Sequence, residues 1–321
     1  MPVVQTDASA ALAIIGVTTE AIRELLGSAA EGGRLYLVGS LAAGLGSRGS
    51  DIDIHIFTED PPAGNTPMMF FLDDHIVDFL YFKHGAPSAA CTTLSARTVE
   101  LPFGHCALGR GLPFKQQNRL SRWVTALPFD REEQLLLDAD QRRTVGGVLV
   151  RSALDEVVAF AAMGTVLDAA KMPSRMFWRR AARQTLHALC RAAGELYIGE
   201  KWLWRNARHA GLDPSLLDEG QRVRSASEFT AFAVHAQLPA FCPEELVRLR
   251  VGDFERFSLA GGVYGLVNDS RLVLLPHTGD LEERSLADAL VQTSPSLLAE
   301  MLAEQLVSLE PDPTAIDKEL L

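Results

Sequence analysis

Two aspartates that stand two residues apart in an apolar stretch constrain the fold of this chain more than any other feature. In Ser50-Asp-Ile-Asp-Ile-His-Ile-Phe57, Asp51 and Asp53 alternate with isoleucines. Such alternation predicts a strand, in which residues i and i+2 project from one face about 7 Å apart. The two carboxylates would repel each other there, and a hard cation such as Mg²⁺ between their oxygens would relieve the repulsion.

The surrounding sequence predicts a small mixed sheet with helices. The expected elements are a helix capped by Thr18 or Thr19 and ending at Gly27, strands over 34–38 and 51–57, and a hairpin of 68–72 and 75–82 around an Asp73-Asp74 turn. A two-residue turn of this kind needs positive φ, which Asp tolerates.

A third acid and a glycine-serine pair complete the pattern. Asp78 is a lone carboxylate in an apolar strand. If that strand pairs beside the one holding Asp51 and Asp53, three carboxylates can hold two metal ions about 3.5–4 Å apart, as in-line phosphoryl transfer requires. Gly39 and Ser40, which end one strand and open a helix, offer free backbone N–H groups to phosphate oxygens.

Taken together, G39-S40-L-A-A-G44, then S50-D51-I-D53, then Asp78 in V-D-F resembles the signature of the DNA polymerase beta-like nucleotidyltransferase superfamily. The closest branches are the aminoglycoside and minimal nucleotidyltransferases, and the resemblance covers about the first 85 residues.

The resemblance implies a set of site residues. The donor is a nucleoside triphosphate, with ATP expected, and the residues implied to bind it are Gly39, Ser40 and Ser50. Two Mg²⁺ ions are implied to bind through the catalytic acids Asp51, Asp53 and Asp78, and Asp78 is also implied to activate the acceptor hydroxyl, as a ligand of the second ion or as a base.

Each part has a simpler interpretation on its own. An isolated Ser-Asp-x-Asp also occurs in surface loops, and Asp78 could pair with an arginine. The three-part pattern favours the metal site. His55 shares a face with Asp51 and Asp53, so it either touches substrate or emerges at a sheet edge, and we expect the edge.

The rest of the chain predicts an α+β protein in three segments. Helical periodicity covers 135–149, 154–167 and 177–196, with shorter helices over 201–210 and 226–237; a hairpin over 261–267 and 271–276, a helical region over 286–306 and a tail of a dozen residues follow. We therefore expect a nucleotidyltransferase domain (1–112), an all-helical acceptor- and triphosphate-binding domain (113–242) and a small C-terminal α/β module (243–321) of unknown role.

The helical segment offers further cations. Arg175, Arg179 and Arg183 form one helical stripe, which suits phosphates or is a solvated face; we take Arg179 and Arg183 as candidate triphosphate ligands. Asp155 and Glu156, on an expected helix, are candidate acceptor-side acids, although nothing in the sequence singles them out as catalytic.

Lys201 stands in a second stretch that resembles known enzymes. Its Lys-Trp-Leu sequence is similar to a segment of related small-molecule nucleotidyltransferases. The resemblance implies that Lys201 reaches the triphosphate and that Trp202 or Trp204 lines the acceptor pocket, whereas core tryptophans beside a solvated lysine are the simpler reading.

Charge and composition limit the partners. The net charge of −11 disfavours long nucleic acids and suits a cationic acceptor, although residues 111–242 alone carry +4. The four scattered cysteines include no C-x-x-C, and no apolar run is long enough to span a bilayer, so we expect a reduced, cytoplasmic protein without membrane contact. The oligomeric state cannot be read from the sequence.

The sequence thus predicts a Mg²⁺-dependent nucleotidyltransferase of the EC 2.7.7 type. It would move AMP from ATP onto a hydroxyl of a small polar molecule, such as an aminoglycoside or another natural product, and release pyrophosphate. The alternatives are a protein adenylyltransferase of the toxin–antitoxin kind, a non-catalytic nucleotide-binding scaffold, and elongation of a short RNA end.

Overall fold

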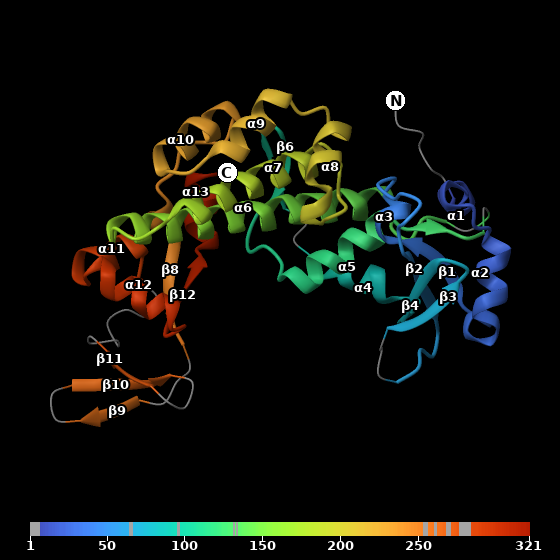
Figure 1. Cartoon of the computed structure of the whole chain (residues 1–321), viewed down its shortest axis with the longest axis horizontal. Coiled ribbons are helices and arrows are strands. Elements are labelled where there is room, and N and C mark those ends of the chain that lie inside the picture. Colours follow the sequence, from blue (N-terminus) through green and yellow to red (C-terminus); the bar gives the residue numbers. More distant parts are fainter. Residues whose placement is uncertain are drawn as a thin grey trace. The chain divides into compact units, whose positions relative to one another are not determined.

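The computed structural model describes residues 7–63, 67–94, 97–130, 132, 134–252, 256–259, 262–267, 271–275 and 284–321. The protein is α+β, as predicted, and forms two compact units, neither of which is continuous in sequence (Figure 1). The first contains Met1–Thr98, Leu112–Leu149 and Cys190–Gly211, and the second contains Val99–Gly111, Val150–Leu189 and Leu212–Leu321. The division into three consecutive functional segments stays a prediction.

The first unit is built on a five-stranded mixed sheet. Its strand order is β3 (Met68–Leu72), β4 (His75–Lys83), β2 (Ile52–Thr58), β1 (Arg34–Val38), β7 (Leu127–Pro128). Strands β2 and β4 are parallel, and the other neighbours are antiparallel. The predicted strands and hairpin are confirmed, and Asp73 in the turn has the expected positive φ of 49°.

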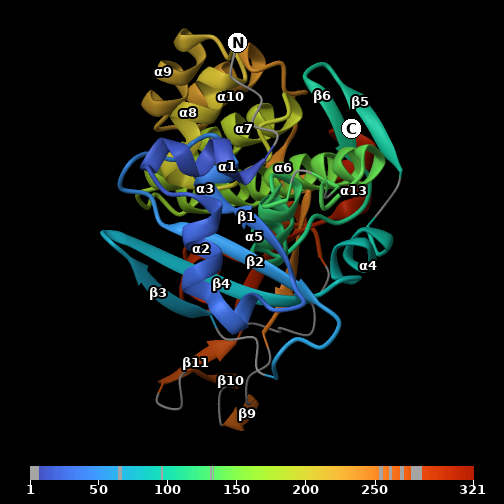
Figure 2. The same cartoon turned by 90° about the vertical axis from the view of Figure 1, so that its right-hand side faces the viewer.

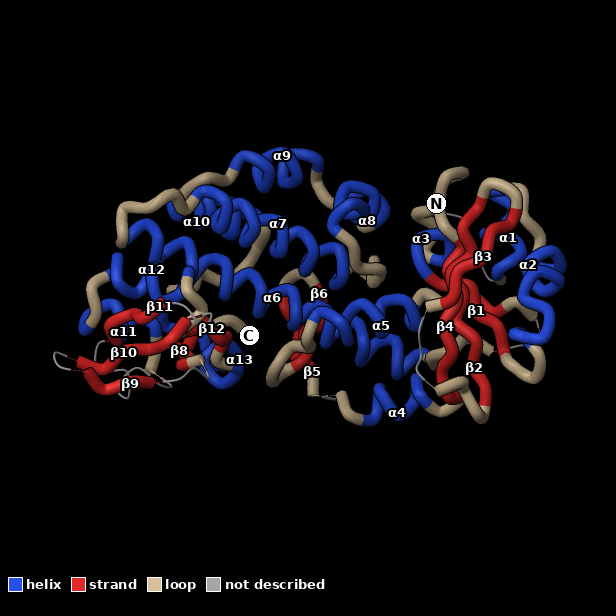
Figure 3. The backbone as a smooth tube through the Cα atoms, turned by 60° about the horizontal axis from the view of Figure 1, so that its bottom comes forward, coloured by secondary structure: helices blue, strands red, loops and turns tan. Residues whose placement is uncertain are grey.

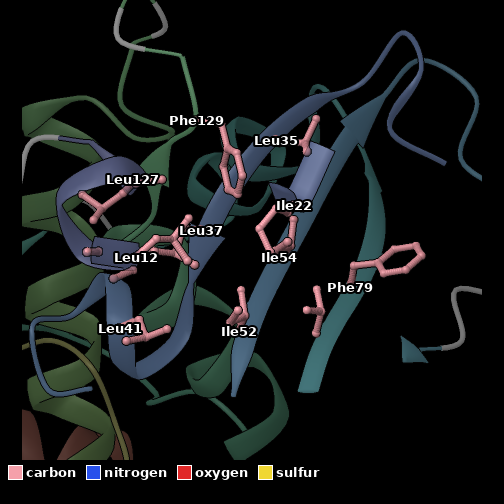
Figure 4. Packing of buried hydrophobic residues seen from close by; sticks show 14 of the residues in the cluster. Leu12, Ile22, Leu35, Leu37, Leu41, Ile52, Ile54, Phe79, Leu127 and Phe129 are labelled. Carbon is pink, nitrogen blue, oxygen red and sulfur yellow. The ribbon is translucent and has the colours of Figure 1, made fainter. Parts of the chain in front are cut away.

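Helices cover both faces of this sheet (Figures 2 and 3). One layer is formed by α1 (Ala8–Leu12), α2 (Thr19–Leu26) and α3 (Gly39–Ala42), and the other by α4 (Ala86–Thr92), α5 (Phe114–Val124) and the first turns of α6. Figure 4 shows Ile52 and Ile54 of β2 in the first core, with Ile22 of α2. Because side chains alternate along a strand, Asp53 projects toward the second layer, the side of α5.

The helical segment runs through both units. Its helices are α6 (Ala139–Ala169), α7 (Arg175–Ala192), α8 (Leu203–His209), α9 (Pro214–Arg222) and α10 (Ala226–His235). The periodic stretches over 135–149 and 154–167 belong to a single helix from Ala139 onward, in which Arg151 Nε donates to Asp155 Oδ1 one turn later, at 2.6 Å. None of the helices in the described ranges has the length and apolarity needed to cross a bilayer.

Two short strands, β5 (Thr98–Leu101) and β6 (Gly104–Ala107), precede α5. Short strands and helices end the chain: β8 (Val247–Val251), β9 (Arg256–Leu259), β10 (Gly262–Val267), β11 (Arg271–Leu275), α11 (Leu286–Gln292), α12 (Pro295–Ala303), β12 (Val307–Pro311) and α13 (Pro313–Glu319). The predicted hairpin is the antiparallel pair β10–β11. The predicted tail is wrong, because β12 pairs with β8 and Asp317 of α13 accepts the Gly109 N–H at 2.9 Å.

Candidate functional site

Two of the three predicted acids lie side by side on parallel strands. The register of β2 and β4 places Asp53 opposite Asp78, and adjacent strands are about 4.8 Å apart. Burial, and then the negative charges of Asp53 and Asp51, raise the pKa of Asp78. Asp78 Oδ1 is buried and has no hydrogen-bond partner in the described part of the chain. Such an oxygen is the kind of group that a bound cation would satisfy.

Gly39 packs directly against this pair. The register places Val38 opposite Asp53, so the chain turns into α3 beside the Asp53 carboxylate. Gly39 has a φ of 77°, and a Cβ atom there would overlap Asp53 Oδ2 and lie 2.9 Å from Cγ. Only glycine fits both the conformation and the space. Ser40, which follows, is buried.

Arg122 of α5 forms an ion pair with one member of the acid pair, Asp53. Its Nη1 donates to Asp53 Oδ1 at 2.8 Å. Burial lowers the pKa of Arg122, but the Asp53 carboxylate together with Tyr197 and Asp78 more than offsets this, and the pKa is raised. Among the described residues, no three His, Cys, Asp or Glu side chains converge as a preformed metal site. The oxygen-only donors, the close carboxylate pair and the unsatisfied Asp78 oxygen nevertheless fit Mg²⁺ chemically.

A cavity of about 580 Å³ opens between the sheet and α5. Asp53 and Asp78 lie at its acidic end, and the α5 wall is lined by Lys115, Asn118, Arg119 and Arg122. These α5 positions follow the i, i+3, i+4, i+7 spacing of a single helix face. Our reading of the sequence missed this helix, although the spacing of its three cations was a signal that could have found it.

His55 is not at a sheet edge, so that prediction is wrong. It lies in β2 at the centre of the sheet and is 2% exposed. Its Nδ1 accepts the Trp123 indole N–H at 3.1 Å. Burial first, and then the positive charges of Arg122 and Arg119, lower the pKa of His55 to about 3. The ring is therefore neutral.

Asp51 and Ser50 end the loop that leads into the site. Asp51 directly precedes β2 and is exposed, so the strand begins one residue later than predicted. Ser50 Oγ accepts the Ser47 N–H at 2.9 Å, which fixes the turn before the acids.

The same loop contacts the segment that contains Lys201. Arg205 of α8 donates to the carbonyl of Leu45. Lys201 Nζ lies 5.0 Å and Arg205 Cζ 5.5 Å from the centre of the Trp202 ring. Arg205 therefore connects the Lys201 segment to the glycine-rich loop, where the resemblance implies phosphates, and both cations lie against the same Trp202 ring. Trp204 is only partly buried.

Three other candidates belong to the second unit. Arg179 and Arg183 lie on α7, with Arg179 exposed and Arg183 half-buried. Asp155 accepts hydrogen bonds from Arg151 and, at 2.8 Å, from the Gly111 N–H, so its contacts are structural.

Comparison with known proteins identifies one part of the chain. Residues 19–84 match the family model described as "Nucleotidyltransferase domain". A crystal structure of a nucleotidyltransferase-like protein from Exiguobacterium sibiricum 255-15 is similar at 14% identity and a TM-score of 0.28, over 68% of this chain and 74% of that one. No curated protein matches the sequence significantly. The matched residues contain Gly39, Ser40 and all three acids, so the site residues lie in the part of the chain that is similar to a nucleotidyltransferase domain.

Proposed function

We propose that the protein transfers a nucleoside monophosphate, AMP from ATP in our expectation, to a hydroxyl of a small polar molecule and releases pyrophosphate. Aminoglycosides and other natural products are the expected class of acceptor. The observation that carries the proposal is the Asp53–Asp78 pair, opposed in register and packed against Gly39, inside the residues that match the domain model.

The protein's own groups have distinct tasks in this reaction. Asp53 and Asp78, with Asp51 at the mouth of β2, would hold Mg²⁺, which when bound neutralises the charge that develops on the triphosphate. Gly39 lets the backbone come close to the phosphates. Lys201 and Arg205, stacked on Trp202 beside the loop, place positive charge near the leaving pyrophosphate.

The positions of these residues imply which bonds form and break. The acceptor oxygen forms a bond to the α-phosphorus, and its proton passes to Asp78. The bond from the α-phosphorus to the oxygen that bridges to the β-phosphate breaks, and pyrophosphate leaves in line with the attack. Arg122 orients Asp53 through their 2.8 Å ion pair.

The test is Mg²⁺-dependent release of pyrophosphate and transfer of label from [α-³²P]ATP in the presence of a cell extract. Asp53→Asn and Asp78→Asn should each reduce turnover at least 100-fold, because each removes a charge from the reacting centre. Asp74→Asn, in the hairpin turn outside the site, is the matched control. Turnover that survives both site substitutions would leave the non-catalytic scaffold as the better account.

One observation favours a second candidate, protein adenylylation. Strand β3 is a sheet edge, and its apolar side chains are exposed: Met69 by 57% and Phe71 by 69%. Met69 lies opposite Asp78 in the register. An exposed apolar edge strand is a template for pairing with a strand of another chain, which would bring a protein hydroxyl next to Asp78. In the same assay, label on a protein band would favour this acceptor, and label confined to small molecules would exclude it.

A further inference from the structure

The charge on α5 bears on the chemistry of the acceptor. Arg119 and Lys115 line the cavity beyond the acid pair, one and two helical turns from Arg122. Within the described ranges, neither of them forms an ion pair with a carboxylate. Arg119 instead lies over the rings of Phe82 and Trp123, with Cζ 5.6 and 5.9 Å from their centres. The guanidinium is thus held in place while its charge stays available.

Two cavities lie on opposite sides of Asp53. The α5 cavity is lined by β4 residues, including Asp78 and Leu80, and by nothing from β1 or α3. A second cavity of about 540 Å³ is lined by Ala42 and Ala43, which follow Gly39 and Ser40, and by Tyr197. Because the sheet order is β4-β2-β1, the first cavity is on the Asp78 side and the second is on the Gly39 side.

The geometry of in-line transfer places the acceptor on one side of Asp53 and the leaving phosphates on the other. The attacking and leaving oxygens must stand on opposite sides of the α-phosphorus. If the leaving phosphates lie at Gly39 and Ser40, the acceptor hydroxyl approaches from Asp78. The α5 cavity is then the acceptor site, and its far wall is cationic although the chain as a whole is acidic. Local charge decides binding in a cavity, because distant surface charges are screened.

We propose that the acceptor is a hydroxyl compound that also carries a phosphate group, such as a sugar phosphate. Its hydroxyl lies at Asp78, its phosphate is bound by Lys115 and Arg119, and Asn118 donates or accepts hydrogen bonds at the polar groups between them. This rests on the proposed nucleotidyl transfer and narrows its acceptor class away from the cationic aminoglycosides.

The dimensions agree with such a molecule. One helical turn separates Arg122 from Arg119 and a second leads to Lys115, so the cations lie about 5 and 10 Å along α5 from the acid end. A hydroxyl and a phosphate at opposite ends of a sugar ring have a comparable separation. The base and ribose of the donor are neutral, so they would form no ion pair with Lys115 or Arg119.

The experiment uses isothermal titration in two stages. First, wild-type protein is titrated with Mg²⁺ and α,β-methylene ATP, which cannot transfer its nucleotide. No binding at this stage would contradict the proposed function. Second, the saturated complex and the nucleotide-free protein are each titrated with ribose 5-phosphate. Ribose is the neutral control ligand and kanamycin is the cationic one.

We expect ribose 5-phosphate to bind at least 10-fold more tightly than ribose or kanamycin. Lys115→Ala and Arg119→Ala should each weaken it about 10- to 100-fold, as the loss of a charge-assisted hydrogen bond does, and leave the affinity for α,β-methylene ATP unchanged. Arg119→Lys should restore part of the loss. Gln116→Ala, exposed on the same helix but outside the cavity, is the control.

Three results would overturn the proposal. The first is that ribose 5-phosphate binds no more tightly than ribose. The second is that kanamycin binds more tightly than ribose 5-phosphate. The third is that the α5 substitutions weaken α,β-methylene ATP instead, which would assign the cavity to the donor. Unchanged melting temperatures of the variants would show that any loss is local.

Discussion

At the scale of single residues, His55 is a neutral histidine enclosed by aromatic rings. Its Nδ1 accepts a hydrogen bond from Trp123, so the one ring proton of the neutral form is on Nε2. The centre of the Phe82 ring is 4.7 Å away. A second proton would bury a charge, close to the positive charges of Arg122 and Arg119, which is why the pKa falls to about 3. It would also break the bond that Nδ1 accepts from Trp123.

This environment predicts a pH dependence of stability. The unfolded chain binds a proton at His55 near pH 6.5, whereas the folded chain binds it only near pH 3. The stability that His55 contributes is therefore complete above pH 6.5 and is lost as pH falls toward 3, at about 1.4 kcal/mol per pH unit.

Urea unfolding of wild type and His55→Gln at pH 7 and pH 5 measures this contribution. The wild type should lose about 2 kcal/mol more than the variant over that range. An NMR titration in which the His55 ring protonates near pH 6.5 in the folded state would contradict the account.

A side chain at a glycine position can cost stability through backbone strain and through steric overlap, and Gly39 and Gly44 allow these two costs to be measured separately. Both have positive φ, 77° and 71°, but a Cβ atom at Gly44 meets nothing within 4 Å, whereas one at Gly39 overlaps Asp53. Gly44→Ala should cost about 1–2 kcal/mol of unfolding free energy, the strain of the backbone alone. Gly39→Ala should cost more and also displace Asp53, so that Mn²⁺ binding measured calorimetrically is lost only in that variant. Equal effects of the two substitutions on metal binding would refute the role given to Gly39.

At the scale of elements, the C-terminal helix α13 is fixed by a buried arginine. Arg151 of α6 is fully buried and binds Asp155 and, through Nη1, Asp317 of α13. The backbone N–H groups of Gly109 and Gly111 donate to the same two carboxylates, at 2.9 and 2.8 Å. All five residues belong to the second unit.

Removing the arginine should therefore be costly. Arg151→Ala leaves two carboxylates without their cation, and we expect a loss of about 3–5 kcal/mol in urea unfolding. Arg222→Ala, on the exposed arginine of α9, should change stability by no more than about 0.5 kcal/mol. A chain ending at residue 312 should lose stability as well, and a truncation without effect would mean that α13 is the tail that the sequence indicated.

The elements differ in how far local sequence determines them. The β3–β4 hairpin and α2 were predictable, because a turn or a capping residue marks their ends: Thr18 Oγ accepts the Ala21 N–H at 3.1 Å. Helix α5 has no side-chain cap, so no capping residue marks where it begins. The ion pair that Arg151 of α6 forms with Asp317 was not predictable, because the two residues are 166 positions apart. No local pattern reports such a contact.

At the scale of the whole molecule, the acids and the phosphate loop were predictable as a motif, but the cavity walls were not. Gly39, Asp53 and Asp78 occur within one short stretch, whereas Arg122 and Trp123 come to the sheet from a segment about 70 residues later. The match to the nucleotidyltransferase family also ends at residue 84. The α5 residues that would select the acceptor are thus outside the part of the chain that matches the family model.

Nucleotide binding should slow hydrogen exchange in the first unit and leave exchange in the second unit unchanged. The acids, the loop and α5 all belong to the first unit, so Mg²⁺ with α,β-methylene ATP should stabilise that unit by mass action, about 2.7 kcal/mol at 100 times Kd. Hydrogen exchange should therefore slow in β1, β2, β4 and α5, because these strands and this helix must open before their amides exchange. The strands β8 and β12 of the second unit serve as the internal control, and we expect their exchange to stay unchanged. Protection confined to β8 and β12, with none in β2 and β4, would place the nucleotide in the second unit, with Arg179 and Arg183, and would remove Asp53 and Asp78 from the site.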